Sequence, residues 1–212
     1  MPACRCACYE SMFDERVAEA DLRRYRRKGP VPTTRRLIDA LRAGGVSGQS
    51  LLDIGGGVGV IQHELIDAGA GHVVQVDAAS AFLLVARAEA ERRGYVERAA
   101  YVHGDFVALA SEIAPADIVT LDRVICCYAD FEALIAASAS RARRTYGIVI
   151  PRNAWWVRFG NLGSNLLQRL RRGAFRSYVH PVEAIDAAVR RQGLTRRYSR
   201  RTLVWEVWVY AR

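Results

Sequence analysis

The sequence predicts an α/β protein built on a doubly wound, mostly parallel β-sheet. Short apolar stretches alternate with helical patterns between residues 46 and 150, and such alternation produces parallel βαβ units. The 212 residues are 51% hydrophobic and 25% charged, which excludes a disordered chain, a collagen-like repeat and a disulfide-dense miniprotein. A chain of this length and class is expected to form one domain.

Residues 1–45 predict a helical cap in front of the sheet. Residues 11–28 carry a helical pattern with Ser11 as a possible N-cap, and Gly29 breaks it. A second helix is expected over residues 33–44, because apolar residues at helical spacing are followed by glycine.

Residues 46–150 carry the strand–helix alternation itself. Strands are expected where short apolar runs follow turn residues, and helices where apolar residues recur every three or four positions. The expected strands are 51–54, 72–76, 99–102, 118–121 and 146–150, and the expected helices are 60–68, 80–93 and 131–140.

The last third of the chain departs from this rhythm. We expect a helix over residues 155–172 to pack its apolar stripe on the sheet, and docking on an anionic membrane surface is the alternative. A helix over residues 181–192 and a pair of strands over residues 198–210 then close the fold. The stripe consists of Trp155, Phe159, Leu162, Leu166 and Leu170.

Positive charge gathers in the same third. Residues 1–140 contain 15 basic and 19 acidic residues, a net charge of −4. Residues 141–201 contain 15 arginines against only Glu183 and Asp186, a net charge of +13. Such a segment either meets an anionic partner or solvates exposed helix faces.

The cysteines form two groups, Cys4-x-Cys6-x-Cys8 and the pair Cys126-Cys127. No secretory signal pattern and no apolar stretch long enough to span a membrane is found in the sequence, so we expect a cytoplasmic protein with free thiols. The three N-terminal thiolates lack a fourth ligand, so a mobile tail and no metal site are expected. The Cys126-Cys127 pair is expected to be buried and inert.

The strongest local signal is a glycine-rich turn between the first strand and its helix. Glycine permits a tight turn and lets a ligand approach the backbone, and the amides of the following helix face the site. A dinucleotide fingerprint, Gly-x-Gly-x-x-Gly, fails in both frames because Val60 and Gln62 occupy its last position. The turn contains Gly55, Gly56, Gly57 and Gly59.

Asp53 lies two residues before the first glycine and completes an acid-x-Gly-x-Gly-x-Gly pattern. This pattern resembles the first motif of class I S-adenosylmethionine (SAM)-dependent methyltransferases. A carboxylate near the turn suits SAM, because this ligand carries a sulfonium and an α-amino group. The resemblance implies SAM as cofactor and a Rossmann-like, seven-stranded sheet with an antiparallel C-terminal strand.

Two further segments follow in the order that the family shows. Asp77 and Ala78 end the second strand, where a carboxylate can accept both ribose hydroxyls. Gly104 precedes Asp105 and Phe106 after the third strand. The resemblance implies that Asp105 bonds the adenine amine and that Phe106 packs on the adenine ring.

Residues 117–128 resemble the fourth motif of the family, which lies between cofactor and acceptor and here contains Asp122 and Arg123. Enzymes that methylate exocyclic amines of nucleic-acid bases usually show a Pro-Pro pair here, and its absence disfavours that reaction. Residues 121–128 and 176–180 are also similar to magnesium-protoporphyrin O-methyltransferases. The resemblance implies a SAM-binding core over residues 46–150 and an acceptor lid over residues 151–180, closed by residues 181–212.

Three residues near the end of this lid are candidates for acceptor chemistry. A hydroxyl acceptor needs a base, and His180 could supply it or serve only as a helix cap. A carboxylate acceptor needs no base, and Arg176 with Tyr178 could hold it by charge-assisted bonds.

The sequence thus predicts a SAM-dependent methyltransferase that acts on an oxygen of a small, possibly anionic acceptor. An RNA methyltransferase that uses the arginine-rich third is an alternative, although no RNA-binding module is recognisable and nucleic acid is disfavoured as a partner. A non-catalytic SAM-binding partner protein is a second alternative.

Overall fold

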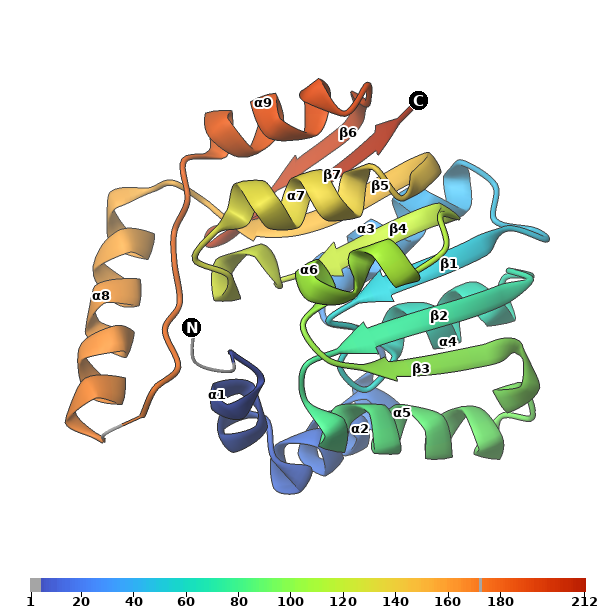
Figure 1. Cartoon of the computed structure of the whole chain (residues 1–212), viewed down its shortest axis with the longest axis horizontal. Helices are drawn as coiled ribbons and strands as arrows, with labels where there is room; N and C mark the ends of the chain where they lie inside the picture. Colours follow the sequence, from blue (N-terminus) through green and yellow to red (C-terminus); the bar gives the residue numbers. More distant parts are fainter. Residues whose placement is uncertain (1–4, 172) are drawn as a thin grey trace.

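A seven-stranded sheet in the order β3-β2-β1-β4-β5-β7-β6 forms the centre of the computed structural model, which describes residues 5–171 and 173–212 (Figure 1). Strands β1 to β5 pair in parallel, as expected for successive βαβ units. The strands are β1 (Ser50–Ile54), β2 (His72–Asp77), β3 (Ala99–His103), β4 (Ala116–Asp122), β5 (Ala142–Pro151), β6 (Thr195–Arg201) and β7 (Trp205–Ala211).

Within the described residues, three helices precede β1, and from β1 to β5 helices separate successive strands along the chain. They are α1 (Arg5–Met12), α2 (Glu15–Lys28), α3 (Pro32–Ala43), α4 (Val60–Asp67), α5 (Ser80–Arg92), α6 (Phe106–Leu109), α7 (Phe131–Ala139), α8 (Trp155–Leu170) and α9 (Val182–Arg191). A short 3-10 turn, η3 (Ile125–Cys127), follows β4. The predicted fold class is confirmed.

Strand β7 is the antiparallel member of the sheet and lies between β5 and β6. A three-residue turn joins β6 to β7, and two strands joined so closely must run in opposite directions. The predicted closing pair of strands is therefore present, and it completes the sheet at the β5 edge.

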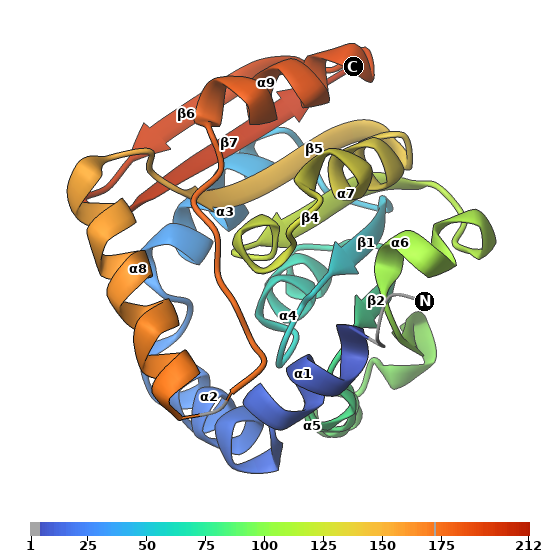
Figure 2. The same ribbon diagram turned by 60° about the vertical axis from the view of Figure 1, so that its left-hand side comes forward.

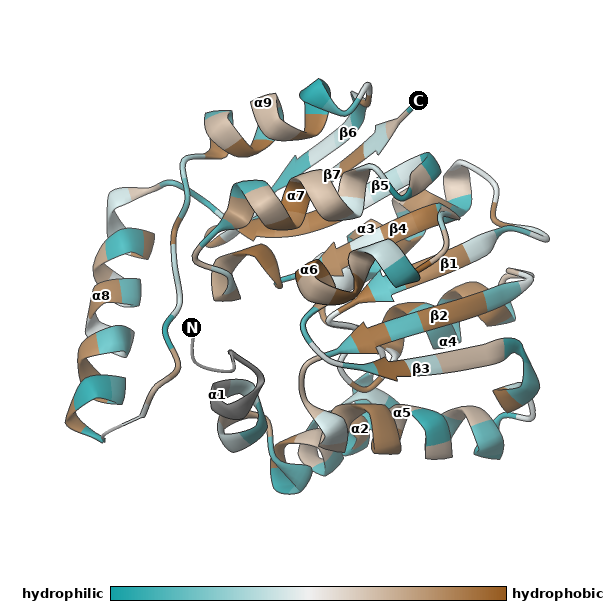
Figure 3. Ribbon diagram, in the orientation of Figure 1, coloured by the Kyte–Doolittle hydropathy of each residue, from teal (hydrophilic) through white to brown (hydrophobic). Residues whose placement is uncertain are grey.

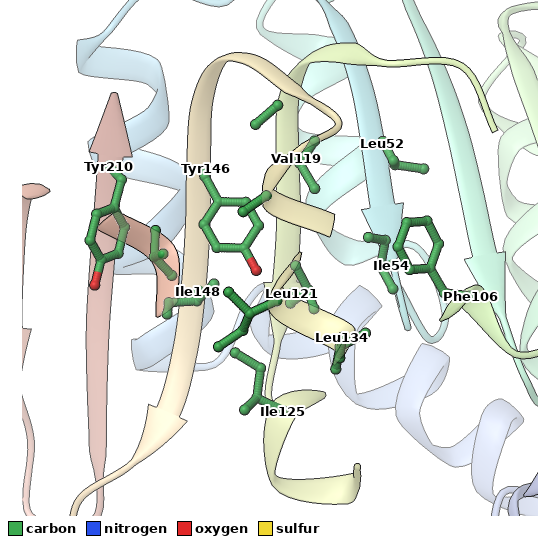
Figure 4. Close-up of a cluster of buried hydrophobic side chains, with 14 of the residues drawn as sticks. Leu52, Ile54, Phe106, Val119, Leu121, Ile125, Leu134, Tyr146, Ile148 and Tyr210 are labelled. Carbon is green, nitrogen blue, oxygen red and sulfur yellow. The ribbon is translucent and has the colours of Figure 1, made fainter. Parts of the chain in front are cut away.

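Helices cover both faces of the sheet and bury its apolar side chains (Figures 1 and 4). One core cluster joins the sheet to α6, α7 and α9, through residues such as Phe106, Leu134 and Ile185. The other core cluster joins the opposite face to α3, α4 and α5, through residues such as Leu37 and Leu65. The carboxyl ends of the parallel strands point toward α1 and α8, so a site at this edge is framed by both helices (Figure 1).

The N-terminal cap differs from the prediction of a single helix over residues 11–28. The helix is divided into α1 and α2, and Asp14 caps α2 by accepting a hydrogen bond from the Val17 amide at 3.0 Å. An aspartate side chain competes with helical backbone bonds and favours this N-cap position, so Ser11 belongs to α1 instead. Cys4 lies outside the described residues, and residues 5–12 form α1 in place of the expected mobile tail.

Helix α8 also departs from expectation. Its apolar stripe was expected to pack on the sheet, yet it is exposed, and only Val157 of this helix is buried. Figure 2 shows α8 standing apart from the sheet. Among residues 5–171 and 173–212, no helix has both the length and the hydropathy that a transmembrane span requires.

Candidate active site at the carboxyl ends of the strands

The glycine turn leaves β1 in a conformation that ordinary residues avoid. Gly55, Gly57 and Gly59 have φ angles of 62°, 56° and 79°, which glycine adopts without a steric penalty. Helix α4 begins directly afterwards at Val60, so its first amides lie next to the turn. The turn therefore presents bare backbone at the end of the central strand.

Asp53 lies behind this turn and not on the wall of a cavity. Its side chain is fully buried, and its Oδ1 accepts a hydrogen bond from Thr120 Oγ1 at 2.7 Å. Burial raises the pKa of Asp53 to about 7. The structure thus corrects the expectation that this carboxylate faces the cofactor: the side chain points under the glycines and supports them.

A cavity of about 290 Å³ opens at the carboxyl ends of the central strands. This is the edge at which open α/β sheets bind their ligands. The predicted residues on its wall are Gly55, Gly57, Asp77, Ala78, Gly104, Asp105, Phe106, Asp122 and Arg123, whereas Asp53, Gly56 and Gly59 do not line it.

Asp77 brings a fixed carboxylate to this cavity from the end of β2. Its Oδ2 accepts a hydrogen bond from the Gly57 amide at 3.0 Å, and its Oδ1 accepts one from the Ala79 amide at 2.9 Å. Burial raises the pKa of Asp77 to about 6, so the carboxylate is mostly ionised at neutral pH. Held in this way, it can accept hydrogen bonds from a pair of ligand hydroxyls.

Asp105 and Phe106 form the next part of the wall, at the start of α6. Asp105 caps this helix through the Val107 amide at 3.0 Å, and both of its oxygens lie 3.0 Å from the Tyr128 hydroxyl. Phe106 is buried and still borders the cavity. A carboxylate beside an aromatic ring suits a flat heterocycle that carries an amino group.

Arg123 places a cation at the cavity, directly after β4. Its φ of 62° is the single positive value among the non-glycine residues that the structure describes. Such a backbone is costly, and residues of this kind are concentrated at functional sites. Its Nε donates to Asp122 Oδ1 at 3.1 Å, and Asp122 also accepts a hydrogen bond from the Thr34 hydroxyl.

The cavity wall also contains residues that the sequence did not indicate as site residues, among them Tyr9, Asp21 and Cys127. The Tyr9 hydroxyl donates to the Cys127 carbonyl at 2.7 Å, which ties α1 to the turn after β4. Cys127 is only half-buried, so the expectation of two buried thiols holds for Cys126 alone. Phe13 also lines the wall, and its four-residue spacing from Tyr9 was the available sequence signal.

The three acceptor candidates lie outside the cavity. His180 Nε2 lies 2.9 Å from the Tyr128 carbonyl, and its ring stacks against Tyr178 at 5.6 Å. Arg176 donates to the carbonyls of Gly173 and Phe175, 2.7 and 2.6 Å away. The structure therefore gives these side chains contacts that hold the segment before α9 and does not bring them to the wall.

The wall residues fit SAM in shape and donor chemistry. Gly55 and Gly57 leave backbone without side chains, Asp77 can hold the ribose hydroxyls, and Asp105 with Phe106 can hold the adenine. On the cofactor side of the wall, the carboxylates of Asp77 and Asp105 favour a cationic cofactor over an anionic one. When bound, SAM supplies a methyl group attached to a positively charged sulfur.

The sheet and its helices form the Rossmann-like fold of methyltransferases. Residues 51–145 match the family model described as a methyltransferase domain. This segment, just under half of the chain, is therefore similar to a methyltransferase domain, and the match supports a methyltransferase enzyme. No curated protein sequence matches the chain significantly.

Solved structures share this fold over most of the chain. The magnesium protoporphyrin IX methyltransferase from Synechocystis PCC 6803, with bound SAH, matches with a TM-score of 0.71 and 21% identity over 98% of this chain and 99% of that chain. An O-methyltransferase family protein from Burkholderia thailandensis matches with a TM-score of 0.70 and 16% identity over 94% and 60%. An O-methyltransferase family 2 protein from Planctomyces limnophilus, in complex with apigenin, matches with a TM-score of 0.66 and 18% identity over 85% and 57%.

Proposed function

We propose that the enzyme transfers the methyl group of SAM to a carboxylate oxygen of a small, anionic acceptor. The observation that carries this proposal is the charge of the cavity wall near the fourth motif. Arg123 is the single cation there, and no histidine or lysine lines the cavity among the residues that the structure describes. A carboxylate is already a nucleophile at neutral pH and needs no base, whereas a hydroxyl acceptor does.

The guanidinium of Arg123 is suited to orient such an acceptor. Only its Nε bonds to Asp122 in the part of the chain that the structure describes, and 40% of the side chain is exposed. The remaining N–H groups can form a fork on a carboxylate, which fixes one oxygen for attack. That oxygen forms the new C–O bond to the methyl carbon, the C–S bond breaks, and its electron pair stays on sulfur.

Positioning supplies most of the acceleration in such an in-line displacement. Holding both reactants in alignment is worth about 7–11 kcal/mol in favourable cases. Tyr9 and Phe13 from the N-terminal cap shield the same cavity and restrict its water. Tyr9, Phe13 and Arg123 thus form the side of the cavity that we assign to the acceptor, and the glycine turn and Asp77 form the side that we assign to SAM.

The test is a methyl-transfer assay with labelled SAM and a panel of small carboxylic acids, phenols and an RNA pool. We expect label in base-labile esters of carboxylic acids. Arg123→Gln should raise the KM for the acid about tenfold or more, and Arg123→Lys should restore part of the loss. Arg176→Gln is the matched control because this arginine lies outside the cavity, and its KM should stay unchanged.

Two outcomes would overturn the proposal. Label that appears only in phenols or only in RNA would assign another acceptor class. Equal KM values for the Arg123→Gln and wild-type enzymes would show that the guanidinium does not hold the acceptor. Titration calorimetry with SAM serves as the control for an intact cofactor site in each variant.

A further inference from the structure

Helix α8 exposes a continuous apolar stripe. The five residues recur at intervals of four, three, four and four positions, which places them on one face of a helix. Their exposures are 69% for Trp155, 68% for Phe159, 66% for Leu162, 57% for Leu166 and 74% for Leu170. Soluble proteins rarely leave so many large apolar side chains together in water, so the stripe indicates an interaction surface.

Another side of α8 holds the helix on the protein and fixes the direction of the stripe. Val157 is buried, and the side-chain amides of Asn161 and Asn165 donate to the Ser177 carbonyl at 3.0 and 2.7 Å. Asparagine thus occupies the side that faces residues 173–180. The stripe lies beside that side, and Trp155, Phe159 and Leu162 border a pocket together with the two asparagines and Val179. The hydropathy colouring in Figure 3 shows brown and teal segments alternating along α8.

The turn between β6 and β7 extends this surface. Leu203 is 73% exposed and Val204 is 38% exposed. The indole Nε1 of Trp156 donates to the Leu203 carbonyl at 3.2 Å, so the turn lies against the first turn of α8. The stripe, Trp156, Leu203 and Val204 together form what we call the α8 surface.

Positive charge accompanies the α8 surface and acidic charge does not. Residues 133–182 contain no Asp or Glu. Arg158 and Arg169 on α8 are exposed, and the Arg152 guanidinium lies 5.5 Å from the Trp156 ring. Arg201 on β6, next to the turn, is exposed but adds no net charge, because it pairs with the buried Glu206 at 3.2 Å. A partner for this surface must therefore combine an apolar layer with negative charge.

We propose that the α8 surface docks in the plane of an anionic lipid bilayer. An amphipathic helix with Trp, Phe and Leu on one face and arginine beside it suits the boundary between headgroups and acyl chains. Arginine near an anionic leaflet adds attraction that weakens with salt. A second copy of this chain is a poorer occupant, because its own α8 would bring the same arginines against these.

The test is co-sedimentation of the full chain with vesicles of equal parts phosphatidylglycerol and phosphatidylcholine. We expect the wild-type protein to pellet with these vesicles, to bind pure phosphatidylcholine at least about tenfold more weakly, and to be released by high salt. The double variant Phe159→Ser/Leu166→Ser should bind at least about tenfold more weakly. Both residues are exposed, so melting followed by circular dichroism should match the wild type.

Leu84→Ser is the matched control, because Leu84 is 69% exposed on α5 and does not belong to the α8 surface. Wild-type protein that stays in the supernatant at low salt would overturn the proposal. Equal losses of vesicle binding in the Leu84→Ser and Phe159→Ser/Leu166→Ser variants would also overturn it. So would a wild-type dimer, detected by light scattering, that the Phe159→Ser/Leu166→Ser variant converts to monomers. This readout does not depend on methyl transfer, so its failure leaves the proposed function unaffected.

Discussion

Replacing Gly56 by alanine tests how the glycine turn is supported. Gly56 differs from its neighbours because its φ is not positive, so alanine can adopt its backbone. An alanine side chain at this position would nevertheless collide with its neighbours. Its Cβ would lie 2.6 Å from Asp53 Oδ2 and 3.0 Å from the Gln75 side-chain carbon Cδ. Both side chains are fully buried and cannot move toward solvent.

The cost follows from packing. An extra methyl group forced into a filled interior costs about 1–3 kcal/mol, and we expect about 2 kcal/mol here. For a chain of this size that corresponds to a fall in Tm of about 6 °C. The Asp53→Ala background removes the nearest atoms, so Gly56→Ala should cost less there than in the wild type.

Gly160→Ala is the matched control, since Gly160 lies inside α8 and no atom lies within 4 Å of its added Cβ. This change should raise stability by about 0.5–1 kcal/mol, because alanine loses less backbone entropy. Urea unfolding and calorimetry at one pH are applied to the wild type, the Gly56→Ala, Asp53→Ala and Gly160→Ala variants and the Asp53→Ala/Gly56→Ala double variant. If Gly56→Ala and Gly160→Ala move the midpoint in the same direction and by the same amount, the reasoning about the turn is wrong.

Three further perturbations probe the site and its supports. Asp77→Asn should weaken SAM binding about tenfold, and wild-type affinity should fall below pH 6 as this carboxylate becomes protonated, while the variant stays flat in calorimetric titrations. Glu89→Gln should cost about 2 kcal/mol at pH 7, because the buried carboxylate is bonded by three arginines. These bonds hold the Glu89 pKa well below its usual range, so this stabilisation is present above pH 4.5 and lost on acidification in pH-dependent melts. His180→Ala should lower the Tm by a few degrees and leave the pH profile of kcat unchanged, since its ring contacts a carbonyl; loss of the acidic limb would identify a base instead.

The sheet and the glycine turn could be predicted because both are encoded locally. Residues 50–60 contain a strand, its turn and the first residue of the next helix, and each depends on neighbours in sequence. The wall residues Asp77 and Asp105 follow from the same logic, since each lies at the end of a parallel strand. Asp53 occupies the position that the pattern predicts, but the direction of its side chain depends on Thr120 in another strand.

Long-range contacts explain what the sequence could not predict. The Tyr9–Cys127 hydrogen bond joins residues 118 positions apart, and no local pattern shows that α1 covers the cavity. Residues 176–180 were assigned to the acceptor, yet the bond between His180 and the Tyr128 carbonyl directs this imidazole elsewhere. In both cases tertiary packing decides which polar group faces a ligand.

The charge asymmetry of the chain therefore needs a different interpretation from the one that the sequence suggested. The arginine-rich third was expected either to meet an anionic partner or to solvate exposed helix faces. It contributes no described residue to the cavity wall, because each of these residues precedes residue 135. The cation at the cavity is Arg123, which lies in the acidic two-thirds beside Asp122. The charge of residues 141–201 acts at the surface instead, where part of it is balanced by ion pairs such as Arg190–Asp186 and the part on α8 accompanies exposed apolar side chains. The net charge of the chain is thus the sum of two regions with different requirements. The cavity must accept a cationic cofactor, and the outer face of α8 suits an anionic layer.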